Sequence, residues 1–337
     1  MSDYFVYQLF ACNSVKERTR LMNSKLKGTL CSIGAAVSYG LNPLGALPLY
    51  SQGINTNTVL FFRYGLAVVL LALFMLFKRQ SFAITKKETS ILVALGILFA
   101  MSSLTLFLSF HYMGAGIACT LLFVYPVMVA VMMTVFFKEK LTIITILSII
   151  LALSGIALLY KGNDGDVLNI TGVILVMISS LTYAIYIIVV NKSPLRISSV
   201  KLTFYVLLFG VISLIIYSLA GDQNNYIQML TTSEMWFYAL ILALFPTVIS
   251  LLLMVVAVHE IGSTPTAIMG ALEPLTAVVI GVVMFGEQLT LKMATGVLMI
   301  LVAVLFIIAG KSLTVNKITT VIGRLGHVVV KHWRWRL

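Results

Sequence analysis

Charged side chains are scarce in this 337-residue sequence, which has 11 acidic residues, 23 basic residues and a charged fraction of 10%. Soluble globular domains average about 25%, so this scarcity excludes an ordinary water-soluble protein. The three cysteines, Cys12, Cys31 and Cys119, lack the spacing of a metal site or a disulfide framework. No phosphate-binding GxxxxGK[ST] loop is present. We therefore expect no metal, no cofactor and no direct use of ATP.

Hydrophobic residues, in contrast, make up 60% of the chain, and the mean hydropathy is +1.06. They form runs of roughly 19 to 25 residues, each long enough to cross a bilayer as a helix. The runs span residues 28–50, 56–77, 89–111, 114–137, 142–160, 170–191, 199–220, 235–258, 262–286 and 290–310. The sequence therefore predicts an all-α membrane protein with ten transmembrane helices.

Positive charge is distributed unevenly between the two sides of this predicted bundle. With the N-terminus inside, 20 of the 23 Lys and Arg residues lie in the two tails or the cytoplasmic loops, as the positive-inside rule requires. We therefore predict a multi-pass protein of the cell (inner) membrane with both termini cytoplasmic. Residues 1–27 form a cytoplasmic extension, whose first 21 residues could instead reflect a misassigned start, and the basic tail 311–337 lies along the inner lipid surface. This distribution explains the formal charge of +12 without nucleic acid.

Shifting the chain against itself by 148 positions reveals a repeat. The shift aligns, without a gap, His111, Gly114, Pro126, Phe137, Glu139, Leu141 and Thr142 with His259, Gly262, Pro274, Phe285, Glu287, Leu289 and Thr290. The chain therefore divides into two five-helix units, residues 28–160 and 170–310, joined by an extracytoplasmic linker at 161–169. Because five is odd, the repeats are inverted, an arrangement typical of transporters that alternate between inward-open and outward-open states around a midplane site.

These features resemble the EamA-type transporters of the drug/metabolite transporter superfamily. The motifs that carry the resemblance are FFKEKLT, FGEQLT, ALEPL, FFRYGLAVVLLAL and AAVSYGLNP, within residues 28–311. The resemblance implies ten helices, a central cavity formed mainly by helices 1, 3, 4, 6, 8 and 9, and export of small metabolites such as amino acids. The chain departs from many relatives at Tyr39, where they carry a tryptophan before the glycine.

Glu273 is the one carboxylate near the middle of an apolar run, at residues 262–286. An ionisable group at that depth is expensive and marks a functional-site hypothesis. Pro274 follows it and loosens the helix there. Glu273 could bind substrate and take up and release a proton as the site changes sides. It could equally be a structural carboxyl that is hydrogen-bonded across a helix contact. Its repeat equivalent in the first half is Tyr125.

Arg63 lies within the second predicted helix, where bracing a neighbouring helix or reaching the interface is favoured over contact with substrate. Its charge could still offset that of Glu273, and we predict these two as the coupling residues. The candidate substrate-binding residues are Tyr39, Asn42, Ser102, Tyr125, Tyr183, Tyr186, Thr247 and Glu273. Helix packing is an alternative role for the tyrosines and is favoured for any single serine or threonine.

Ionisable residues at the helix ends are interpreted as structural. Glu139 and Glu287 precede Leu-Thr at the starts of the fifth and tenth predicted helices, where an anion suits the helix dipole. His111 and His259 lie at helix ends, where interfacial or capping roles are favoured over a proton relay.

The sequence thus predicts a secondary transporter that exports small polar or amphiphilic metabolites by alternating access, with proton coupling left open. Uptake of a metabolite or nucleotide-type solute and a non-transporting membrane scaffold are the alternatives. An enzyme is not expected, because the spans contain one central carboxylate and no clustered nucleophile and base. The expected partners are the lipid bilayer, a small-molecule substrate and protons, without nucleic acid. A homodimer is left open.

Overall fold

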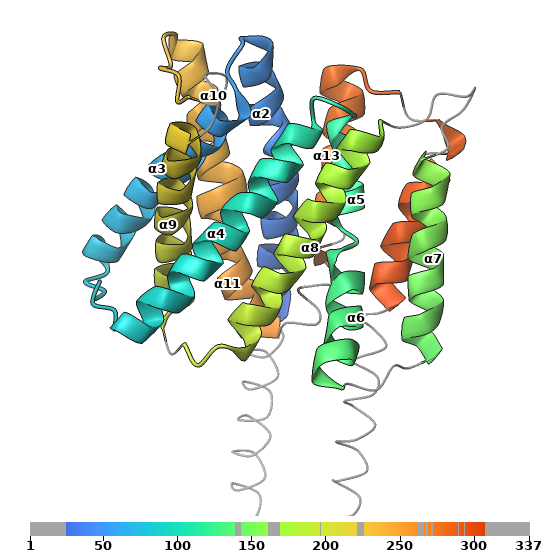
Figure 1. Cartoon of the computed structure of the whole chain (residues 1–337), viewed down its shortest axis with the longest axis horizontal. Coiled ribbons are helices and arrows are strands. Elements are labelled where there is room, and N and C mark those ends of the chain that lie inside the picture. Colours follow the sequence, from blue (N-terminus) through green and yellow to red (C-terminus); the bar gives the residue numbers. More distant parts are fainter. Residues whose placement is uncertain are drawn as a thin grey trace, which may run out of the picture.

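The computed structural model describes residues 25–138, 143–160, 169–195, 197–220, 226–261, 266, 269–270, 272–288, 290–292 and 294–306. All regular secondary structure in these residues is helical, and the helices lie side by side as a bundle (Figure 1). After a first helical stretch at 25–40 come α2 (Asn42–Ser51), α3 (Thr56–Phe77), α4 (Lys86–Ser109), α5 (Ala115–Leu122), α6 (Tyr125–Phe137), α7 (Ile143–Tyr160), α8 (Ile170–Lys192), α9 (Ser199–Ala220), α10 (Ser233–Ala243), η3 (Leu244–Ile249), α11 (Ser250–Ile261), α13 (Leu272–Phe285) and a last helix at Ala294–Phe306.

The predicted class, an all-α membrane protein, is confirmed. Seven helical spans in the described part of the chain are long and apolar enough to cross a membrane. The bounds of α3 and α9 coincide with the predicted runs 56–77 and 199–220. The count of ten helices and the inverted repeat stay predictions. Most of the predicted N-terminal extension (1–24), the linker at 161–168 and the tail from 307 lie outside the described residues.

Prolines lie at interruptions of two membrane spans, the first at Lys25–Ser51 and another at Ala115–Phe137. A proline cannot donate to the carbonyl four residues earlier, and inside a membrane that carbonyl needs another partner. In the first helix a turn at Leu41 separates residues 25–40 from α2, which has Pro43 in its first turn. Asn42 Nδ2 donates to the freed carbonyl of Tyr39 at 2.8 Å. A turn beside Pro43 therefore interrupts this helix.

In the span Ala115–Phe137, a side chain from another helix donates to the carbonyl that a proline leaves free. This span separates into α5 and α6, with Pro126 in the first turn of α6. The carbonyl four residues before this proline belongs to Leu122, and Ser180 Oγ on α8 donates to it at 3.1 Å. In the predicted run 262–286, α13 begins at Leu272 and carries Pro274 in its first turn. Both aligned prolines, Pro126 and Pro274, therefore lie beside a helix interruption.

The helix that runs from Ser233 to Ile261 contains the π-helical turn η3. Pro246 lies in this turn and leaves the Leu242 carbonyl without its usual donor. The hydroxyl of Thr247 donates to that carbonyl at 2.9 Å. Local π-helical turns of this kind occur frequently at functional sites.

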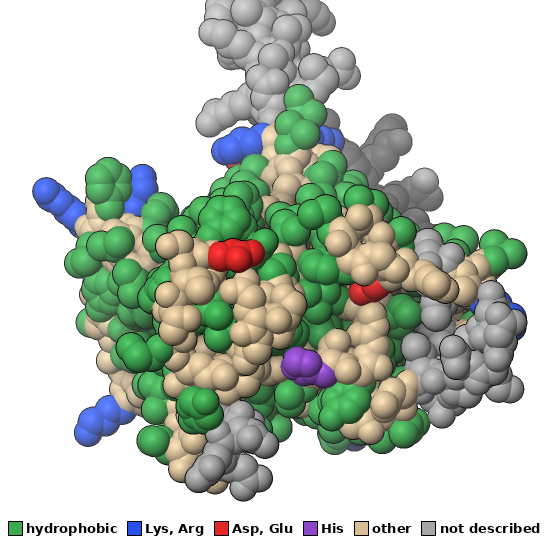
Figure 2. Space-filling view, turned by 90° about the horizontal axis from the view of Figure 1, so that it is seen from above, with side chains coloured by type: hydrophobic (Ala, Val, Ile, Leu, Met, Phe, Trp, Pro, Cys, Tyr) green, Lys and Arg blue, Asp and Glu red, His purple; other side chains and the backbone are tan. Residues whose placement is uncertain are grey.

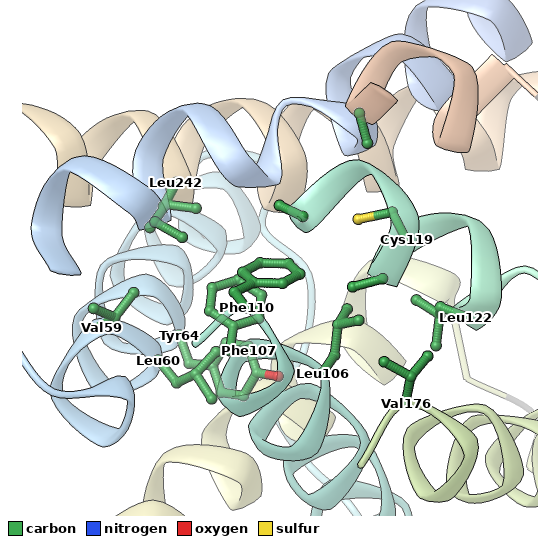
Figure 3. Packing of buried hydrophobic residues seen from close by; sticks show 14 of the residues in the cluster. Val59, Leu60, Tyr64, Leu106, Phe107, Phe110, Cys119, Leu122, Val176 and Leu242 are labelled. Atoms are coloured by element: carbon green, nitrogen blue, oxygen red, sulfur yellow. The ribbon is translucent and has the colours of Figure 1, made fainter. Parts of the chain in front are cut away.

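The core lies where α4 crosses the neighbouring helices. α4 packs against α8 and α9, while α13 packs against α5 (Figure 1). Figure 3 shows Phe107 and Phe110, at the end of α4, between Tyr64 of α3 and Leu122 of α5. The ring centroids of Phe107 and Phe110 are 5.2 Å apart.

Large hydrophobic side chains also cover the outside of the bundle. Phe77 and Leu219, at the ends of α3 and α9, are 84% and 82% exposed. Figure 2, which looks onto the molecule from above, shows hydrophobic side chains around the periphery of the bundle, with few charged side chains among them. A surface this apolar would aggregate in water, so it suits a lipid environment.

Candidate functional site

A cavity of about 410 Å³ lies inside the bundle, between the first helix, α3, α4, α5, α6, α8, α11 and α13. Its volume falls within the range of small-molecule sites. Seven of the predicted site residues line it: Tyr39, Arg63, Ser102, Tyr125, Tyr183, Tyr186 and Glu273. Asn42 and Thr247 are not part of the lining.

Glu273 lies in the first turn of α13, and its backbone N–H donates to the Gly270 carbonyl at 3.0 Å. The first helix approaches this turn very closely. A Cβ atom on Gly40 would lie 2.7 Å from the Glu273 carbonyl oxygen and 2.6 Å from Thr276 Cβ. Only glycine permits this approach, which brings the neighbouring Tyr39 to the same wall of the cavity as Glu273.

The residue Glu273 is half-buried and lines the cavity. No hydrogen bond or ion pair joins it to another side chain within the described part of the structure. Arg63 interacts with it electrostatically but does not form an ion pair with it. The structural alternative, a carboxyl hydrogen-bonded across a helix contact, thus finds no partner among the described residues.

Arg63 is committed to bracing the bundle. The side chain is 2% exposed, and its Nε donates to the Thr247 hydroxyl at 3.0 Å. The guanidinium carbon lies 5.2 Å from the ring centroid of Phe107 and 5.8 Å and 5.9 Å from those of Tyr64 and Tyr39. These contacts agree with the favoured interpretation, in which Arg63 braces a neighbouring helix. Thr247 supports the site through Arg63.

Aromatic rings form a continuous wall on the α8 side of the cavity. The centroids of Tyr125 and Tyr183 are 4.7 Å apart in an edge-to-face arrangement. Tyr183 and Tyr186 stack at 5.7 Å, and Phe99 of α4 lies 5.4 Å from Tyr186. Phe99 is not among the residues predicted from the sequence to bind substrate. Its spacing from Ser102 and Ser103 places all three on one face of α4, which is the signal that could have identified it.

Ser102 lines the cavity, but its polar group is used in helix packing. Its hydroxyl lies 3.1 Å from the Ser179 hydroxyl and donates to the Ser179 carbonyl at 3.0 Å, while Ser179 Oγ donates back to the Ser102 carbonyl at 2.6 Å. These bonds join α4 to α8. Ser32 is also absent from the predicted site residues; it borders the cavity and donates to the Thr266 carbonyl at 3.3 Å.

Asn42 is 2% exposed and serves the interruption of the first helix. Its amide nitrogen caps the Tyr39 carbonyl, and its Oδ1 has no hydrogen-bond partner among the described residues. The amide therefore supports the cavity wall through Tyr39.

Glu287 makes structural contacts, and its hydrogen-bond partners lie in another helix. Its carboxylate accepts hydrogen bonds from the backbone N–H groups of Ala115 at 2.6 Å and Gly116 at 3.3 Å. The anion therefore lies at the N-terminus of α5. Partial burial raises the pKa of the Glu287 carboxyl, against the opposing effect of these two donors. Its repeat mate Glu139 lies outside the described residues.

His111 lies just beyond the end of α4 and contacts the start of α3. Its Nε2 is 3.1 Å from the Thr56 hydroxyl, and its ring centroid is 4.4 Å from that of Tyr50. Partial burial lowers the pKa of the imidazole. These contacts agree with an interfacial role. The side chain of His259 is outside the described part of the structure.

An all-helical membrane bundle with an internal cavity of this size, bordered by one carboxylate and several aromatic rings, has the construction of a small-molecule transporter. The chain belongs to the EamA-like transporter family, whose model matches it twice, at residues 26–161 and 170–309. It is a multi-pass membrane transporter of the drug/metabolite transporter type.

Curated relatives agree with this assignment. The chain is 24% identical to the uncharacterized transporter YcbK of Bacillus subtilis (strain 168), over 80% of this chain and 88% of YcbK. It is 23% identical to the uncharacterized transporter YvbV of the same organism, over 61% of this chain and 68% of YvbV. An uncharacterized transporter of Archaeoglobus fulgidus is 29% identical over 56% of this chain and 66% of its own.

A solved crystal structure shares the fold. It superposes with a TM-score of 0.61 over 83% of this chain and 97% of the other, at 12% sequence identity.

Proposed function

We propose that this transporter exports small polar or amphiphilic metabolites, such as amino acids, by alternating access and in exchange for protons. The observation that carries the proposal is the internal cavity, in which the Glu273 carboxyl faces the open space without a bonded partner in the described structure. A carboxyl held in this way is available to a solute or a proton. The proposal places the protein in the cell (inner) membrane with both termini in the cytoplasm.

The cavity lies across the middle of the bundle. Ser32, Val190 and Met254 border it from the halves of their helices that lie nearer the predicted cytoplasmic side, whereas Arg63, Leu106 and Leu122 border it from the opposite halves. A solute bound there would lie between the two faces of the membrane, as alternating access requires. The proposal includes inverted five-helix repeats, which are supported by the two matches of the family model and by the interruptions beside Pro126 and Pro274.

The substrate is best identified by comparing metabolites inside and outside cells with and without the protein. Solutes that accumulate outside only when the protein is present are then tested for flux in proteoliposomes. Net uptake of the same solutes would favour the uptake carrier. Absence of saturable flux for every candidate would overturn the proposal in favour of a scaffold.

Proton coupling is tested by imposing a pH gradient on the proteoliposomes. We expect Glu273→Gln to abolish the dependence of flux on that gradient, because the amide keeps the shape of the side chain but cannot exchange a proton. Glu234→Gln, at an exposed carboxyl in the first turn of α10, is the matched control and should retain the dependence. Equal pH dependence in wild type and Glu273→Gln would remove Glu273 from the coupling mechanism.

A further inference from the structure

The central cavity presents an accessible carboxylate, while its positive charge is enclosed. Glu273 faces the open space and has no bonded partner in the described structure. Arg63 borders the same cavity, but it is 2% exposed and its Nε donates to Thr247. The rings of Tyr39, Tyr64 and Phe107 surround its guanidinium carbon at 5.2–5.9 Å. A solute that enters the cavity therefore meets an open carboxylate and a guanidinium that is almost fully enclosed.

The surroundings of Glu273 are aromatic. Tyr39, Tyr125 and Tyr183 come from three different helices, and each lines the same cavity as Glu273. Tyr186 continues this wall by stacking on Tyr183. The π faces of such rings attract cations, and their carbon surfaces accept flat apolar groups. Rings and carboxylate together favour one kind of ligand, a positive charge attached to an apolar body.

Other ligand classes fit less well. An anionic solute would place a second negative charge beside Glu273, while the positive charge of Arg63 is 2% exposed. A metal ion would need further ligands, and the described residues contain no group of three His, Cys, Asp or Glu side chains that could hold one. A neutral polar solute would not require a carboxylate.

We propose that the cavity recognises the ammonium group of a small amine, with the carboxylate of Glu273 as its partner and the tyrosine wall as the surface for its apolar body. The ligand needs no carboxylate of its own. This inference rests on the proposed function, because it identifies the substrate class of the same site. For amino acids, it means that the amino group is the recognised part.

The test uses the purified full-length protein in detergent and isothermal titration calorimetry with three probes of similar size and different charge. These probes are 2-phenylethylamine, 2-phenylethanol and phenylacetate. We expect the amine to bind and the alcohol and the acid to bind at least about tenfold more weakly, which corresponds to the loss of one charge-assisted hydrogen bond. Phenylalaninamide should bind more tightly than phenylalanine, because the amide lacks the carboxylate.

Glu273→Gln should weaken amine binding at least about tenfold and leave binding of the alcohol unchanged. Glu273→Asp keeps the charge and should retain most of the affinity. Glu234→Gln, on the exposed surface, is the control and should match wild type. Thermal unfolding of each variant shows whether it is folded, and Glu273→Asp carries the test if Glu273→Gln is not.

Equal affinity for the amine, the alcohol and the acid would overturn the inference, as would unchanged amine binding in a folded Glu273→Gln. Failure of the inference and failure of the proposed function are distinguishable. Saturable export of solutes without an ammonium group would overturn the inference and leave export standing. Glu273-dependent amine binding without flux of any amine would overturn export and leave the ammonium site standing.

Discussion

Substitution of Gly40 by alanine tests the contact that positions Glu273. The added Cβ would lie 2.6 Å from Thr276 Cβ and 2.7 Å from the Glu273 carbonyl oxygen. Ordinary contacts between carbon atoms are about 3.5–4.0 Å, so the first helix and α13 must separate locally by roughly 1 Å. Because one of the obstructing atoms belongs to the backbone, a side-chain rotation cannot relieve the clash. Overpacking of this kind costs about 1–3 kcal/mol.

Gly65→Ala is the matched control, because a Cβ at Gly65 of α3 meets nothing within 4 Å. There the substitution should be neutral or should stabilise the helix by about 0.5–1 kcal/mol. Thermal unfolding of the purified proteins in one detergent measures the difference. We expect Gly40→Ala to unfold below wild type and Gly65→Ala at or above it. If Gly40→Ala unfolds at the same temperature as Gly65→Ala, the close approach of the first helix to α13 is wrong.

Three further substitutions test the contacts around the cavity and at its outer end. Thr247→Val leaves two buried groups without a partner, Arg63 Nε and the Leu242 carbonyl, and should lower the free energy of unfolding by about 1–3 kcal/mol for each of them. Unchanged thermal stability would show that Thr247 does not hold Arg63 in place. Ser102→Ala should lower the free energy of unfolding by about 0.6 kcal/mol, because the hydrogen bonds of Ser102 to Ser179 are lost. A loss of flux without this loss of stability would instead assign Ser102 to substrate binding. Glu287→Gln tests a pH dependence: because the folded-state pKa of this carboxyl is raised, its contribution to stability is complete below the ordinary value of 4.5 and declines as pH rises through the folded value. The difference in unfolding temperature between wild type and this variant should therefore be most favourable to wild type near pH 4 and shrink towards pH 7, and a constant difference would contradict the pKa shift.

The sequence predicts the helices well because bilayer thickness fixes the length of an apolar run. It also predicts where helices break, since the effect of a proline on its own backbone is local. The aligned positions of Pro126 and Pro274 correspond to the interruption between α5 and α6 and to the start of α13. At Pro43 even the compensating group is local, because the preceding Asn42 caps the freed carbonyl.

Partners that are distant in the chain could not be predicted in this way. Arg63 is 184 positions from Thr247, and Ser102 is 77 positions from Ser179. Glu287 contacts the N-terminus of α5 172 positions away, although its own sequence context suggested a local cap. Each contact depends on how two helices cross, which neither periodicity nor composition specifies.

The charge that the cavity presents to a solute follows from the backbone of the helix that runs from Ser233 to Ile261 and contains η3. Pro246 leaves the Leu242 carbonyl without a donor, and the hydroxyl of Thr247 donates to it. The same hydroxyl accepts the hydrogen bond of Arg63, so a single side chain satisfies two buried polar groups. Because Arg63 is held there and enclosed by rings, it does not pair with Glu273, although both border one cavity. The sequence suggests that the two charges could offset each other, whereas the structure keeps the carboxyl available to a ligand.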